Sequence, residues 1–193
     1  MNVSIIINVR NGEKYIAEAI NSALIQTYKD FEIIIFDNNS DDKTKKVIEN
    51  FKDSRIKYFF SEKYLSLGEA RNKAIEKSNY DLIAFLDSDD TWEKFKLEKQ
   101  IKLFDDPEVG IVISDSYFFN QLGKRKQIYK KNNPPTGNVF RSLLSNYFIS
   151  LETVIIRKSF LEKFNLSFDN QFEVIEEFDL FLRLSYHCKL AYV

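Results

Sequence analysis

Three acidic residues in one loop have the types and spacing for metal chemistry. Asp87, Asp89 and Asp90 directly follow the apolar run of residues 82–86. Like charges this close repel one another and need a cation or extensive solvation, and carboxylate oxygens suit Mg²⁺ and Mn²⁺. Because side chains two positions apart point the same way in an extended chain, we predict Asp87 and Asp89 as metal ligands. The alternative is a solvated acidic turn before the next helix.

Composition excludes several other kinds of site. The chain has one histidine, His187, and one cysteine, Cys188, so these residues cannot build a zinc site or a disulfide framework. A Ser-His-Asp triad would have to use His187, whose neighbours are apolar and cationic. With 28 basic and 29 acidic residues, the formal net charge of −1 argues against a nucleic-acid partner.

Polar residues also follow the first two apolar runs of the chain. Asn8 and Arg10 close the run of residues 3–9, and Asp37 closes the run of residues 31–36. In dinucleotide-binding folds, an acidic residue at the end of the second strand binds the ribose, but those folds also need a glycine-rich turn after the first strand. The first turn here has a single glycine, so classical NAD binding is disfavoured. A nucleotide could still bind with its phosphates on a metal at the acidic loop.

These polar residues need a scaffold that brings the ends of several strands together. The apolar runs predict strands at residues 3–9, 31–36, 55–60, 82–86 and 110–114. Helical periodicity predicts helices at residues 13–26, from 40 or 41 to 51, 68–77 and 93–104. Strands that alternate with helices predict an α/β fold with a largely parallel sheet, which binds ligands beyond the carboxyl ends of its strands.

The pattern is less regular after about residue 116. We expect helices at residues 140–144 and 178–184, and strands at residues 153–156 and 190–193. No linker or repeat interrupts the sequence, which predicts one domain. The first nine residues lack a basic segment and a cleavage site, and no apolar run approaches membrane-spanning length. The sequence therefore predicts a cytoplasmic protein.

Five cations lie between Lys124 and Lys131. A solvated hairpin is one interpretation of this stretch. The other is contact with an anionic lipid surface or a lipid-phosphate acceptor, which would place the protein at the inner face of the cell membrane.

Five segments together resemble the family 2 glycosyltransferases of the GT-A fold. Residues 68–75 are similar to the Ala-Arg-Asn helix of that family, and residues 84–92 to its metal-binding Asp-x-Asp segment. Residues 176–184 are similar to the acidic motif that holds the catalytic base. Residues 3–16 and residues 22–37 are similar to the N-terminal segments of family members. The order and spacing are family-like along nearly the whole chain, which makes the set specific although no single segment is.

The resemblance implies a GT-A domain with a Rossmann-like, mostly parallel central sheet flanked by helices and an irregular C-terminal acceptor portion. It implies one domain over residues 1–193, with a nucleotide-sugar-binding half at 1–115 and an acceptor half at 116–193. Family members usually continue further, so we expect the chain to be truncated. The implied reaction is inverting sugar transfer from a nucleotide-diphospho-sugar, with a UDP-sugar favoured, to an acceptor hydroxyl. The implied cofactor is Mn²⁺ or Mg²⁺, and the acceptor is a glycan or a lipid-linked glycan in polysaccharide or cell wall synthesis.

The resemblance also implies a role for each matching residue. The base and ribose of the donor would be held by Asn8, Val9, Arg10, Asp37 and Asn38. Arg71 would lie near the nucleotide and its phosphates. Asp87 would face the ribose or the metal, and Asp89 would bind the metal. Glu177 would be the general base, with Glu176 as the competing candidate, while acidic residues at a helix N-terminus are also favourable without any catalytic role.

Three positions depart from the family pattern. Asn38 stands where an acid is usual, and Arg10 where an aromatic residue is common. Glu177 stands where the base is usually Asp, and its side chain is one methylene longer. These departures affect the choice of nucleotide base and the geometry of the acceptor.

Three alternatives remain open, as does formation of a homodimer. In a haloacid-dehalogenase-like phosphatase, Asp87 would be the nucleophile and Asp89 the acid, but no Gly-Asp pair follows and residues 3–77 are unexplained. A non-catalytic module could hold a nucleotide-sugar without turning it over. A nucleotidyltransferase would usually need a glycine-rich basic loop, which the sequence lacks.

Overall fold

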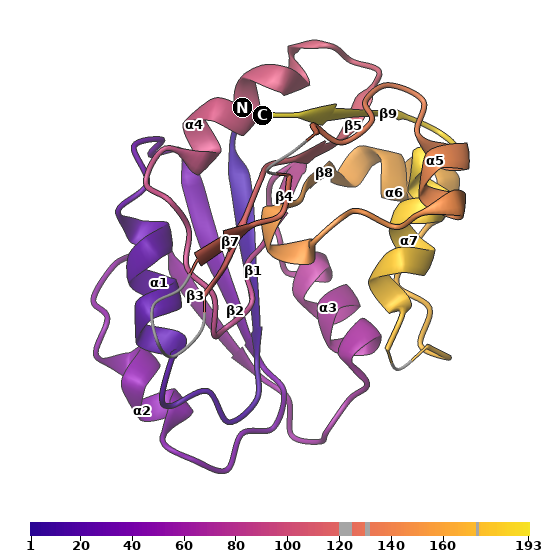
Figure 1. Ribbon diagram of the computed structural model, residues 1–193. Coiled ribbons are helices and arrows are strands. Elements are labelled where there is room, and N and C mark those ends of the chain that lie inside the picture. Colours follow the sequence, from indigo (N-terminus) through magenta and orange to yellow (C-terminus); the bar gives the residue numbers. More distant parts are fainter. Residues whose placement is uncertain (120–124, 130–131, 173) are drawn as a thin grey trace.

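A seven-stranded sheet forms the middle of the protein (Figure 1). The computed structural model describes residues 1–119, 125–129, 132–172 and 174–193. The strands are β1 Val3–Val9, β2 Phe31–Asp37, β3 Ile56–Phe60, β4 Leu82–Phe85, β5 Val109–Ile113, β6 Tyr117–Phe119, β7 Arg125–Gln127, β8 Ile155–Arg157 and β9 Lys189–Tyr192. The α-helices are α1 Ile16–Leu24, α2 Thr44–Glu49, α3 Leu67–Glu76, α4 Lys96–Ile101, α5 Phe140–Ser145, α6 Lys158–Phe164 and α7 Glu176–Ser185. Two 3₁₀ helices are η1 Lys102–Asp105 and η2 Leu151–Thr153.

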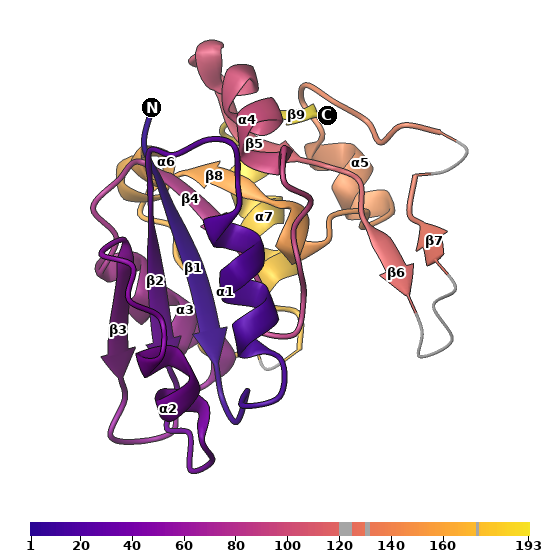
Figure 2. The same ribbon diagram turned by 90° about the vertical axis from the view of Figure 1, so that its left-hand side faces the viewer.

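The strand order is β3-β2-β1-β4-β8-β5-β9. All neighbouring strands are parallel except that β8 runs antiparallel to both β4 and β5. The expected α/β fold with a mostly parallel sheet is confirmed. Strands β6 and β7 form a separate hairpin that stands away from the main sheet (Figure 2).

Helices cover both faces of the sheet, which explains why the central strands β1, β2, β4 and β5 are mostly apolar. Ile5 and Ile7 of β1 pack in a core with α1, α2 and α4, whereas Ile6 packs in a second core with α3, α5, α6 and α7. Successive side chains of a strand point to opposite faces, so a strand buried on both sides reads as a continuous apolar run. This is why the first five strands could be predicted from sequence.

Several elements differ from the sequence-based expectation. Helix α6 was not predicted, because the segment Lys158–Phe164 is short and mixes charged with aromatic residues. The helix expected over residues 93–104 is α-helical only at Lys96–Ile101 and continues as η1. The hairpin strands β6 and β7 were not assigned either. Lys124, Lys130 and Lys131 lie outside the described residues, so lipid contact by this stretch stays a prediction. Within the described parts of the chain, no helix is long and apolar enough to cross a membrane.

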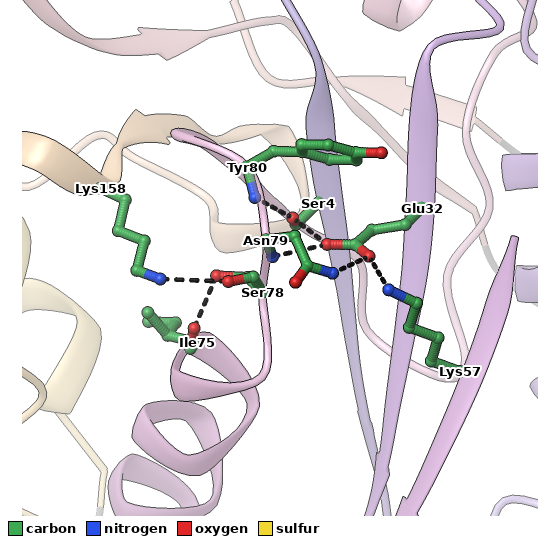
Figure 3. Close-up of polar contacts among 8 residues, drawn as sticks. All are labelled: Ser4, Glu32, Lys57, Ile75, Ser78, Asn79, Tyr80 and Lys158. Carbon is green, nitrogen blue, oxygen red and sulfur yellow. Dashed lines mark hydrogen bonds and ion pairs between the residues drawn. The ribbon is translucent and has the colours of Figure 1, made fainter.

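A buried carboxylate joins three strands at the amino end of the sheet (Figure 3). Glu32 of β2 is 4% exposed and accepts hydrogen bonds from Ser4 of β1 at 2.7 Å and from Lys57 of β3 at 2.6 Å. The backbone and side-chain nitrogens of Asn79, just before β4, each donate to it at 2.7 Å. Burial raises the pKa of Glu32, but the hydrogen bonds from Lys57, Asn79 and Ser4 outweigh it, so the pKa lies below its ordinary value.

We expect Glu32→Gln to lower the free energy of unfolding by about 2 kcal/mol, because hydrogen bonds to a charged acceptor are stronger than those to an amide. The lowered pKa means that the carboxylate contributes stability above the unfolded-state pKa near 4.5 and loses it as pH falls through the folded-state value. The free energy of unfolding, measured with urea, should therefore fall more for the wild type than for the variant when the pH is lowered from 5.5 to 3.5.

Glu49→Gln is the matched control. Glu49 lies 4.0 Å from Lys45 on the exposed face of α2, and its loss should change stability by about 0.5 kcal/mol or less. Parallel pH dependence of wild type and Glu32→Gln would contradict the assignment.

Candidate active site

The carboxyl ends of β1, β2 and β4 bring the predicted polar residues to one edge of the sheet. Strand β1 lies between the other two, with Val9 opposite Asp37 and Ile6 opposite Phe85. The backbone N–H of Leu86 donates to the carbonyl of Ile6 at 3.0 Å, which aligns the start of the acidic loop with the end of β1. The expected convergence at this edge is therefore present.

Asp37 and Asn38 are buried and hold neighbouring loops. The Asp37 carboxylate accepts hydrogen bonds from the backbone N–H of Ser40 at 2.9 Å and from the Tyr58 hydroxyl at 2.8 Å. The side-chain amide of Asn38 donates to the carbonyl of Leu65 and accepts from its N–H, both at 2.9 Å. In this arrangement Asn38 positions the segment before α3, and a contact with a nucleotide base stays a prediction.

The three residues at the end of β1 have different surroundings. The side-chain nitrogen of Asn8 is buried and has no hydrogen-bond partner among the described residues, a situation that costs about 1–3 kcal/mol unless a ligand accepts from it. Val9 is a packing residue, because a Cβ added at Gly12 would lie 2.4 Å from its side chain. Arg10 is exposed and its guanidinium lies 4.5 Å from the ring centre of Tyr64.

Arg71 connects three segments that are far apart in the sequence. It lies on α3, is 4% exposed and donates to the Glu176 carboxylate at 2.5 Å. The same guanidinium lies 3.7 Å from the Asp87 carboxylate and 3.9 Å from that of Glu177. One buried cation therefore holds the acidic loop and the start of α7 at the same place.

The two glutamates at the start of α7 differ in availability. The Glu176 side chain is 4% exposed and paired with Arg71, whereas that of Glu177 is 27% exposed. Burial raises the pKa of Glu177 to about 7; Arg71 lowers it, and the charges of Asp87 and Glu176 raise it further. A carboxylate with a pKa near neutrality suits a general base, so this geometry favours Glu177 over Glu176.

The acidic loop turns instead of continuing as an extended chain. The N–H of Asp90 donates to the carbonyl of Asp87 at 3.1 Å, so the extended chain that the alternation argument required is not present here. The assignment of Asp87 and Asp89 as metal ligands stays a prediction. Asp89 is exposed, and the Asp87 side chain is 42% exposed. Burial raises the pKa of Asp87, which Arg71 lowers and the charges of Glu152 and Asp89 raise. Burial and the same neighbouring carboxylates raise the pKa of Asp90 to about 7.

These hard oxygen donors fit a divalent cation that completes its shell with ligand phosphates. The described residues form no group of three or more side chains that could hold a metal ion by themselves. Burial raises the pKa of Asp87 and Asp90 and mutual repulsion raises it further, and a bound cation would relieve that repulsion.

Two site residues were missed by the sequence analysis. Glu152 in η2 raises the pKa of Asp87, Asp90 and Glu177 through its charge. Tyr147 has a buried hydroxyl with no partner among the described residues, and its ring packs edge-on against Phe178, the residue after Glu177, with centres 5.1 Å apart. One signal in the sequence could have indicated Glu152, because it is the only charged residue between Arg141 and Arg157.

Comparison with known proteins gives a consistent result. Residues 4–164 match the family model described as glycosyl transferase family 2. The Escherichia coli protein WfgD is named UDP-Glc:alpha-D-GlcNAc-diphosphoundecaprenol beta-1,3-glucosyltransferase. It is 34% identical over 166 residues, which are 86% of this chain and 64% of WfgD.

Two solved structures share the fold. Residues 1–349 of S. aureus TarS superpose with a TM-score of 0.81 at 23% identity, covering 100% of this chain and 58% of that one. The Pyrobaculum calidifontis mannosyltransferase PcManGT, solved with GDP-Man and Mn²⁺, gives a TM-score of 0.73 at 16% identity, covering 100% and 54%. These likenesses confirm the GT-A fold. The chain spans between 54% and 64% of the length of these three proteins.

We expect Arg71→Met to lower the free energy of unfolding by about 3–5 kcal/mol, because it leaves the Glu176 carboxylate buried without a partner. Adding Glu176→Gln should recover most of the loss, and a double-mutant cycle in urea measures the coupling.

Arg183→Met serves as the comparison, since its ion pair with Asp179 on α7 is partly exposed and should contribute about 1 kcal/mol or less. Equal losses of unfolding free energy in the two arginine variants would contradict this prediction. Purely additive effects in the double variant would show that Arg71 and Glu176 are not coupled.

Proposed function

We propose, since the chain belongs to glycosyltransferase family 2, that it transfers a sugar from a nucleotide-diphospho-sugar to an acceptor hydroxyl, with inversion and with a divalent metal. The observation that carries this proposal is the set of carboxylates around Arg71. Asp87 and Glu177 lie on either side of one buried guanidinium at the edge of a parallel sheet where such folds bind ligands. In the proposed reaction, this edge would supply a phosphate site and a base to one reacting centre.

The donor is best explained as a UDP-sugar. WfgD is named as a UDP-Glc-dependent glucosyltransferase, and TarS has been solved with UDP-GlcNAc. In this chain the unpartnered nitrogen of Asn8 and the stacked guanidinium of Arg10 are the groups that would contact the nucleotide. Asp37 and Asn38 would shape this pocket by fixing the loops around it.

Asp89 and Asp87 would hold Mn²⁺ or Mg²⁺ together with oxygens of the diphosphate. When bound, the ion would supply positive charge that stabilises the departing diphosphate, an effect of several kcal/mol. Arg71 lies within 3.7 Å of Asp87 and would orient that carboxylate and add positive charge beside the phosphates.

Glu177 would accept the proton of the acceptor hydroxyl. As the acceptor oxygen bonds to the anomeric carbon, the bond from that carbon to the diphosphate breaks and its electron pair leaves with the diphosphate. Attack opposite the leaving group inverts the configuration at that carbon. The partial exposure of Glu177 leaves it open to the acceptor, and base catalysis of this kind contributes about 10²–10⁴-fold.

The acceptor is proposed to be a glycan or a lipid-linked glycan in polysaccharide or cell wall synthesis. The printed name of WfgD gives a diphosphoundecaprenol-linked sugar as its acceptor. We assign donor binding to residues 1–115 and acceptor binding to residues 116–193. Contact with a membrane surface through the stretch from Lys124 to Lys131 remains part of this proposal.

Thermal unfolding with UDP, GDP and dTDP, each with and without Mn²⁺, tests the donor site. A diphosphate present at 100 times its Kd should add about 2.7 kcal/mol of stability. We expect a shift for UDP that needs Mn²⁺ and disappears in Asp89→Ala. Asp105→Ala, an exposed aspartate in η1, should keep the shift. No shift with any nucleotide would refute the donor site.

Release of UDP from a UDP-sugar in the presence of an acceptor tests the base. Glu177→Gln should lower kcat by about 10²–10⁴-fold, because an amide cannot take the proton. Glu177→Asp should retain more activity, since it keeps the carboxylate. Both variants should keep the UDP–Mn²⁺ thermal shift. Wild-type turnover by Glu177→Gln would remove Glu177 from the catalytic role.

A further inference from the structure

A cavity of about 610 Å³ lies directly beside the acidic loop. Its walls come from residues 90–93, the beginning of α4, residues 114–119 and η2. The volume falls within the roughly 300–1,000 Å³ of small-molecule sites. Asp90 belongs both to this cavity and to the loop that would hold the diphosphate, so the cavity adjoins the place where the sugar would be transferred.

The sheet brings η2, which carries the cavity-lining residue Glu152, next to that loop. In the antiparallel pair of β4 and β8, Ala84 lies opposite Ile155, and the N–H of Phe85 donates to the carbonyl of Val154 at 3.3 Å. Beyond this point β4 passes into the acidic loop and β8 is preceded by η2, so the acidic loop and η2 are neighbours. The charge of Glu152 raises the pKa of both Asp87 and Asp90, as expected for a carboxylate close to that loop.

Side chains from the segment around α4 fix the backbone of η2 beneath this carboxylate. The indole N–H of Trp92 donates to the carbonyl of Glu152 at 2.9 Å. Lys96 and Gln100 both donate to the carbonyl of Thr153, at 3.2 and 2.7 Å. Lys96 is buried, and its ammonium lies 4.3 Å from the Trp92 ring centre. The Glu152 carboxylate itself accepts hydrogen bonds from the Ser150 hydroxyl at 2.7 and 2.6 Å. Groups held this firmly are suited to orient a ligand.

The lining of the cavity favours a neutral, polar ring. Exposed aromatic surface comes from Phe95 and from Tyr117, Phe118 and Phe119 of β6, which are 50%, 49%, 62% and 64% exposed, whereas Trp92 is 6% exposed and contributes little of it. The charged lining residues are Asp90, Glu93, Lys96, Lys99, Asp115 and Glu152. Carboxylates outnumber cations there, so an anionic ligand group would be repelled, while sugar hydroxyls can donate to the carboxylates. Aromatic faces pack well against the C–H faces of a sugar ring.

We infer that this cavity binds a neutral sugar ring of the acceptor and that Glu152 accepts a hydrogen bond from its hydroxyl groups. The inference rests on the proposed transferase function and adds the acceptor class and a specificity-determining residue. It also extends acceptor binding beyond residues 116–193 to the cavity wall formed by residues between 90 and 115. Glu152 would orient the ring so that one hydroxyl reaches Glu177 across the end of the acidic loop.

Trp92 makes the inference directly measurable, because it is the single tryptophan of the chain and lines the cavity. We would titrate the protein, saturated with UDP and Mn²⁺, with methyl glycosides of neutral hexoses and N-acetylhexosamines and follow Trp92 fluorescence. At least one glycoside should give a saturable change. Glu152→Gln should weaken its apparent affinity about tenfold or more, as expected for a lost hydrogen bond to a charged group.

Tyr117→Ala is a second variant whose side chain is half exposed, so truncation leaves the core intact, and it should also weaken binding. Glu18→Gln, an exposed glutamate on α1, is the control and should leave the affinity unchanged.

A UDP–Mn²⁺ thermal shift without any fluorescence change across the panel would overturn the acceptor cavity. Tighter binding of a sugar phosphate or uronate would overturn the preference for a neutral ring, and unchanged affinity in Glu152→Gln would overturn its role. Absence of the UDP–Mn²⁺ shift would instead refute the proposed function, and this inference with it.

Discussion

The buried ion pair of Arg71 and Glu176 is the interaction on which the rest of the site depends. Each charge loses several kcal/mol of hydration when it is buried, and the pair is stable because each satisfies the other. Its members are 105 positions apart, on α3 and at the start of α7. The contact therefore fixes the irregular C-terminal part against the regular sheet, and it sets the position of Glu177 relative to Asp87.

The two ends of the sheet use carboxylates in opposite ways. At the amino end, Glu32 is surrounded by donors that lower its pKa, so its charge stabilises the fold. At the carboxyl end, burial and mutual repulsion raise the pKa values of Asp87, Asp90 and Glu177. Negative charge there is unfavourable until a cation or a ligand donor approaches. The carboxylate at the amino edge therefore stabilises the fold, whereas those at the carboxyl edge have the raised pKa values that are common at functional sites.

Strand β8 positions η2 beside the acidic loop. It enters the sheet antiparallel between β4 and β5, so the turn before it, which carries Glu152, meets the loop after β4. Trp92, Lys96 and Gln100 then hold that turn through its carbonyl groups. The turn before this antiparallel strand thus forms one side of the candidate site, and the loops after the parallel strands form the other.

The sequence by itself determined strands β1–β5, the GT-A family resemblance and the loops that carry the polar residues, because apolar runs and turn residues are local signals. Only the tertiary structure placed Glu152 beside Asp87, gave Asn38 its contact with Leu65 and distinguished Glu177 from Glu176. These features depend on pairs of residues that are tens of positions apart. Their contacts are decided by strand register and by the burial of charge, and neither leaves a periodic pattern in the chain.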